Sequence, residues 1–172
     1  MSFPSLIRTK KWVGDTKCRF CDEEETVLHL FFQCSAAKYV WSVVGTAVGA
    51  RNRHGSFLQF FWWLPQFINA SRNVQITGLA AICWVIWKLR NRACFEKKLI
   101  KSLFELISYS CVFINYWAGL HPDQEQRYLR EGAAMLLQVA AAGAADASRN
   151  LMIEGDTDGD ATVVEDRGGA AE

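Results

Sequence analysis

Three cysteines and one histidine lie within seventeen residues near the start of the chain, in the order Cys18-x2-Cys21-x7-His29-x4-Cys34. The two-residue gap lets the sulfurs of the first cysteine pair reach one metal ion from a tight turn. His29 and Cys34 would close the site from a second segment. Three thiolates and one imidazole are a ligand set that tetrahedral Zn²⁺ accepts, so the spacing predicts a zinc site. Four protein ligands leave no open position for water, which predicts a structural metal rather than a catalytic one.

The length and composition are those of one globular domain with a tail. The chain has 172 residues, of which 51% are hydrophobic and seven are tryptophan. We expect a zinc-binding segment over residues 1–50, a helical region of the same domain over 51–142, and a disordered acidic tail over 143–172. The tail is rich in Gly, Ala and Asp and lacks the apolar periodicity of the preceding part.

Hydrophobic periodicity of three and four residues predicts a mainly helical fold. The fold class that we expect is a small zinc-stapled knuckle followed by a bundle of four to five helices. Ser71 is a candidate N-cap for a central helix, and Trp84 and Trp87 lie in an apolar part of it that we expect to be buried. The expected helices cover residues 26–33, 36–48, 57–68 with a break at Pro65, 72–95, 99–118, and a stretch starting near 123.

The cysteines and the N-terminal segment favour an intracellular protein. The stretch MSFPSLIRTKK has no apolar core of a secretory signal peptide. Cysteines clustered with a histidine at metal spacing are typical of reducing compartments. No apolar run reaches the roughly 18 residues of a membrane span, so we expect no membrane partner. The sequence does not decide between nucleus and cytoplasm.

Charge is unevenly distributed along the chain. Residues 1–145 carry 17 Lys and Arg against 10 Asp and Glu, whereas residues 146–172 carry two against eight. A basic body with an acidic tail is compatible with nucleic-acid contact, and equally with a solvated surface. The densest basic cluster follows the apolar part of the central helix and comprises Lys88, Arg90, Arg92, Lys97, Lys98 and Lys101. These cations are candidates for phosphate contacts, although a helix C-terminus favours cations for its own stability.

The stretch FLQFFWWLPQF, which starts at Phe57, is the most aromatic part of the chain. Its rings cover more than one face of any helix. The segment is therefore either sandwiched inside the bundle or partly exposed as an apolar patch. We favour burial.

Two segments resemble the zinc-binding region at the C-terminal end of reverse transcriptases from plant LINE-type (non-LTR) retrotransposons. The first is CRFCDEEETVLHLFFQCSAAKYVW, which starts at Cys18 and contains the Cys and His pattern, and the second is WVIWKLRNRACF, which starts at Trp84. The lead-in KKWVGDTKC is also similar to that family. The resemblance covers about residues 8–100, and the tail does not share it.

The resemblance implies a non-catalytic zinc-binding module that helps a reverse transcriptase to engage RNA or DNA. The polymerase part of the retroelement protein would be a further partner. No catalytic aspartate set, phosphate-binding loop or nucleophile triad is recognisable in the sequence, so we expect no enzymatic activity. Two other interpretations stay open: a protein-interaction module in which the zinc is purely structural, and a retroelement relic without function.

Overall fold

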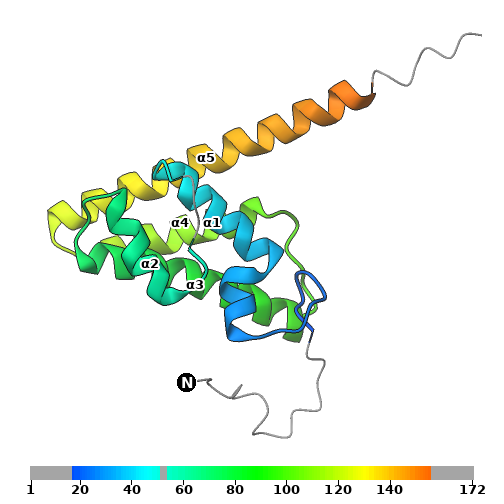
Figure 1. The fold of residues 1–172 in the computed structure, drawn as a ribbon, viewed down its shortest axis with the longest axis horizontal. Helices are drawn as coiled ribbons and strands as arrows, with labels where there is room; N and C mark the ends of the chain where they lie inside the picture. Colours follow the sequence, from blue (N-terminus) through cyan, green and yellow to red (C-terminus); the bar gives the residue numbers. More distant parts are fainter. Residues whose placement is uncertain (1–16, 51–53, 156–172) are drawn as a thin grey trace, which may run out of the picture.

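The computed structural model describes residues 17–50 and 54–155, and this part of the chain is mainly helical. Its β-structure is confined, within those residues, to one isolated bridge between Lys17 and Glu24. The expected fold class, a mainly helical chain that begins with a Cys and His knuckle, is confirmed (Figure 1). The elements are η1 (His29–Gln33), α1 (Ser35–Ala47), α2 (Phe57–Trp63), η2 (Leu64–Gln66), α3 (Arg72–Phe95), α4 (Phe104–Ala118) and α5 (Asp123–Gly155).

Helix α3 is the central element and has the bounds that its sequence predicts. It begins after Ser71, whose side chain accepts a hydrogen bond from the backbone N–H of Val74 at 3.3 Å. It runs for 24 residues and packs against α4, α5 and the zinc-binding segment at η1. Helix α4 packs against both α3 and α5, so these three helices form the body of the bundle (Figure 1).

The core joins the N-terminal part of the chain to this body. Trp41 of α1 is 1% exposed, and Ile86 of α3 and Leu106 of α4 are equally buried. Helix α1 packs against α5 and η1, so the zinc-binding segment and the helical region share one hydrophobic core. Burial of large apolar side chains such as these contributes about 1.5–3 kcal/mol each to folding.

The aromatic segment is divided between the core and the surface. Phe60 and Trp63 are buried, whereas Leu58 is 71% and Trp62 is 73% exposed. The sequence favours burial of the whole aromatic segment, but only one side of α2 is buried. As expected, the α-helix ends just before Pro65, and the chain continues as the short 3₁₀ turn η2.

Two expectations about α3 and α4 are wrong. Helix α4 begins at Phe104, five residues later than expected, because Lys97 has a left-handed φ of 57° and the chain reverses direction before Phe104. Trp84 and Trp87 are 43% and 44% exposed, because the neighbours of α3 cover its other sides.

Helix α5 continues past residue 142, where the sequence predicted that order ends, to Gly155. Alanine, the strongest helix former, is the commonest residue in its second half. Figure 1 shows this half projecting beyond the other helices. The rest of the predicted tail, residues 156–172, lies outside the described residues.

None of the described helices combines the length and apolar character that crossing a membrane requires.

Candidate metal centre

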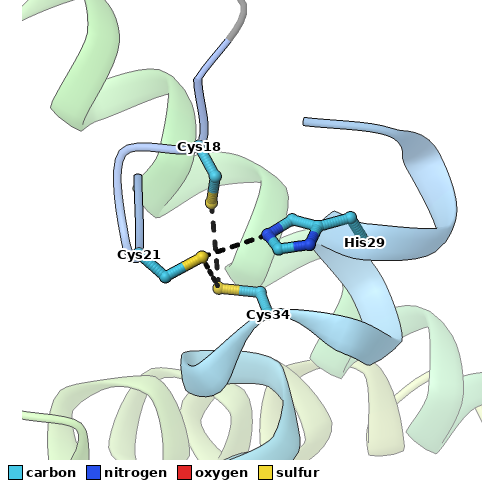
Figure 2. A group of neighbouring side chains, drawn as sticks. All are labelled: Cys18, Cys21, His29 and Cys34. Atoms are coloured by element: carbon cyan, nitrogen blue, oxygen red, sulfur yellow. Dashed lines mark hydrogen bonds between the residues drawn. The ribbon is translucent and has the colours of Figure 1, made fainter. Parts of the chain in front are cut away.

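The first two cysteines lie in a tight turn that the backbone closes on itself. The N–H of Cys18 donates to the carbonyl of Glu23 at 2.7 Å, and the N–H of Asp22 donates to the carbonyl of Cys18 at 3.0 Å. Asp22 has a φ of 60°, in the left-handed region that aspartate tolerates better than most residues. The turn directs the sulfurs of Cys18 and Cys21 to the same side (Figure 2).

The second pair of donors comes from a π-helical turn. The N–H of Cys34 donates to the carbonyl of His29, five residues earlier, at 2.7 Å. The hydroxyl of Thr26 accepts from the N–H of His29 at 3.0 Å and holds the start of this turn. The sequence predicts an ordinary helix over 26–33, but the wider π turn brings His29 and Cys34 onto one face. Such turns occur frequently at functional sites.

The four donor atoms converge as a tetrahedral ion requires. All lie within 4.8 Å of one another, and Cys34 Sγ is 3.7 Å from Cys18 Sγ and 3.6 Å from Cys21 Sγ. Zn–S bonds of about 2.3 Å in a tetrahedron place two sulfurs about 3.8 Å apart, so these separations fit. Nε2 of His29 is 3.1 Å from Cys21 Sγ and faces the sulfurs (Figure 2). The residues therefore fit one zinc ion, which the three sulfurs and Nε2 would hold.

Burial makes this site unfavourable for bare thiolates. Cys18 and Cys34 are completely buried, and His29 is 8% exposed. Burial, together with the neighbouring cysteines, raises the pKa of Cys18 to about 12, and burial likewise raises the pKa of Cys34. A divalent cation would supply the charge that keeps thiolates stable there, and its binding would release protons.

An ion pair that the sequence did not predict attaches the zinc-binding segment to α3. Arg90 donates from Nε to both carboxylate oxygens of Glu25, at 2.9 and 3.1 Å. Its Nη2 lies 2.6 Å from Oε1 of Glu25. The Glu25 side chain is 8% exposed and that of Arg90 is 21% exposed. The hydrogen bond with Glu25 raises the pKa of Arg90. The only sequence signal was that both residues fall within the segments that carry the family resemblance.

Arg90 is also one of the six candidate phosphate-binding residues, and this pair engages its guanidinium. The structure places the other five differently. The ammonium of Lys88 lies 5.3 Å from the centre of the Phe113 ring. The half-buried Arg92 has an Nε that finds no hydrogen-bond partner within residues 17–50 and 54–155. Lys97, Lys98 and Lys101 are exposed in or next to the linker between α3 and α4.

Comparison with known proteins points to the same segment. Residues 3–41 match a family model described as zinc-binding in reverse transcriptase. Comparisons with curated proteins and with solved structures found no match. The match ends at Trp41, so it includes all four metal-site residues and excludes α2 to α5. Together with the Cys3His cluster, it supports a reverse transcriptase zinc-binding region in the N-terminal part of this chain.

Proposed function

We propose that this chain is a non-catalytic, zinc-stapled module of a plant LINE-type reverse transcriptase and that it helps the polymerase part to engage RNA or DNA. The metal's role is structural, since three thiolates and one imidazole complete a tetrahedron and leave no site for a reacting water. The plant LINE-type origin rests on the two sequence segments that resemble that family.

One observation carries the nucleic-acid part of the proposal. The Glu25–Arg90 pair fixes the zinc-binding segment at the basic end of α3. Lys97 and Lys101 are exposed just beyond that end, so a zinc-stapled segment would lie beside the part of the chain that carries these cations. Cations in such an array attract phosphates without reading the sequence.

The first test measures metal content and nucleic-acid affinity on the zinc-loaded chain. We expect about one zinc per chain by mass spectrometry, and loss of that zinc in Cys21→Ser. Fluorescence anisotropy with a labelled oligonucleotide should show affinity that falls steeply as salt is raised. An absence of zinc, or of any affinity at low salt, would refute the corresponding half of the proposal.

A matched pair of double variants locates the phosphate contacts. Lys97→Gln with Lys101→Gln removes two cations from the linker, and Arg127→Gln with Arg130→Gln removes two exposed cations from α5. We expect the first pair to weaken binding and to lower the slope of log affinity against log salt by about 1.4 for a single strand. The α5 pair should leave the slope nearly unchanged, and equal effects would mean that binding is not localised at the linker.

An alternative function, protein interaction with a purely structural zinc, is favoured by the exposed side of α2. Leu58 and Trp62 are largely exposed there, and apolar patches of this kind mark partner surfaces. The same salt titration separates the two functions. A chain that loads zinc but binds no nucleic acid at low salt would favour the protein-interaction module.

A further inference from the structure

Helices α3 and α4 share an outer face that combines aromatic and basic side chains. Trp84, Trp87, Lys88 and Arg92 follow one stripe of α3 at helical spacings of three and four. Helix α4 contributes its own residues at spacings of four. We call this surface the aromatic-basic face, and it consists of Trp84, Trp87, Lys88, Arg92, Tyr109, Phe113 and Trp117.

Four rings of this face, those of Trp84, Trp87, Phe113 and Trp117, form a continuous chain of contacts. The ring centres of Trp84 and Trp87 are 5.2 Å apart with an angle of 30° between their planes, and Phe113 lies 6.5 Å from Trp84. Phe113 also contacts Trp117, at 5.8 Å. Both Trp84 and Trp87 are more than two-fifths exposed. Exposed indoles at this density require an explanation, because large apolar side chains usually find a partner.

A groove between α3 and α4 opens in the same face. Its volume is about 220 Å³, which is below the roughly 300 Å³ at which pockets for drug-sized ligands begin. It therefore suits a single flat ring. The apolar residues Val85 and Leu89 line it together with Lys88, Arg92, Tyr109 and Phe113.

Arg92 adds an independent sign of a ligand. Its Nε lies buried at this groove and has no hydrogen-bond partner among the described residues. A buried charged donor without an acceptor costs free energy. Arg90, only two residues away, has its acceptor in Glu25. The unmet donor of Arg92 therefore calls for an acceptor from outside the described part of the chain.

We infer that the aromatic-basic face binds single-stranded nucleic acid, with bases stacked on Trp84 and Trp87 and with Lys88 and Arg92 meeting phosphate or base oxygens. Flat rings and negative charge occur together in this ligand, and both are complementary to the face. Stacking platforms flanked by cations are the usual means of binding single strands. A duplex hides the faces of its bases, so it is excluded from this mode of binding. The inference rests on the proposed function and names the site and the form of the nucleic acid.

The test compares tryptophan variants on the zinc-loaded full chain. Trp84→Leu and Trp87→Leu should each weaken binding of a single-stranded oligonucleotide by at least about fivefold. Trp62→Leu is the matched control, since Trp62 is an even more exposed tryptophan on α2. It should bind like the unmodified chain. Stacked bases should also quench tryptophan fluorescence, and the combined Trp84 and Trp87 variant should lose most of that quenching.

The outcomes separate this inference from the proposed function. No affinity for any nucleic acid overturns both. Salt-dependent affinity that is equal for duplex and single strand, or that survives both tryptophan changes, keeps the proposed function and overturns the stacking face. If the tryptophan variants instead convert a dimer into a monomer by sedimentation, with unchanged affinity, the face joins two copies of the chain and the inference is wrong.

Discussion

His54 shows how a single side chain can make stability depend on pH. It is 5% exposed and lies among the rings of Phe32, Trp41, Phe60 and Trp63, and neither ring nitrogen has a hydrogen-bond partner among the described residues. Burial lowers its pKa to about 4, against 6.5 for the free side chain. Between pH 4 and pH 6.5, His54 is therefore protonated in the unfolded chain but neutral in the folded chain. The free energy of unfolding should fall as the pH is lowered through this window.

The expected loss from this histidine between pH 7 and pH 5 is about 2 kcal/mol. His54→Phe keeps an aromatic ring and removes the titrating group, so urea unfolding of this variant at saturating zinc should depend less on pH. Every other titrating group is common to the two proteins, so its effect cancels in the comparison. Parallel stability curves for the two proteins would show that His54 is not buried in its neutral form.

The Glu25–Arg90 pair makes a second prediction at the scale of residues. Glu25→Ala leaves the partly buried guanidinium of Arg90 without its acceptor, which should lower the free energy of unfolding by about 3 kcal/mol. Glu24→Ala is the control, because Glu24 is the neighbouring residue and its side chain is exposed. This change should alter the free energy of unfolding by less than about 0.5 kcal/mol. Urea denaturation measures both, and a double-mutant cycle with Arg90→Ala isolates the interaction. Additive effects of the two changes would mean that the pair contributes nothing.

At the scale of elements, the start of α3 is tied to the start of α5. The Ser71 hydroxyl caps α3 and donates to Glu125 at 2.5 Å, and Glu125 is 2.9 Å from Nδ1 of His121. Nε2 of that histidine lies 2.9 Å from the hydroxyl of Thr77. The hydrogen bonds from Ser71 and His121 lower the pKa of Glu125. Ser71 thus both caps α3 and links α3 to α5.

Replacing this serine should therefore cost more than an ordinary cap. Ser71→Ala is expected to lower the free energy of unfolding by about 1–2 kcal/mol. Ser71→Thr keeps the hydroxyl and should recover most of that loss. Urea denaturation measures both, with Ser56→Ala at the cap of the short α2 as the reference. A Ser71→Ala variant no less stable than the Ser56→Ala variant would contradict the double role.

The sequence predicted those elements whose signals are local. The bounds of α3 followed from the Ser71 cap and a continuous helical pattern. The convergence of the four candidate metal ligands followed from their spacing. Exposure of Trp84 and Trp87 depends on which sides of α3 its neighbours cover, so the apolar pattern was misleading there. Glu25 and Arg90 are 65 residues apart, and opposite charge alone does not select one partner from many. The π turn at His29 was missed because helical propensity does not distinguish it from an α-helix.

For the whole molecule, the shared core decides what zinc removal does. The metal's binding free energy is folding free energy, about 10 kcal/mol or more for structural zinc, which is comparable with the total stability of a domain. Chelation should therefore unfold the segment from Cys18 through α1, whose Trp41 packs in the common core. Helices α4 and α5 pack mainly against each other, so they should retain more order. Hydrogen exchange with and without chelator should show protection lost first over residues 18–47. Uniform loss over all helices would mean a single cooperative unit, and unchanged protection would show that the cluster is not a zinc staple.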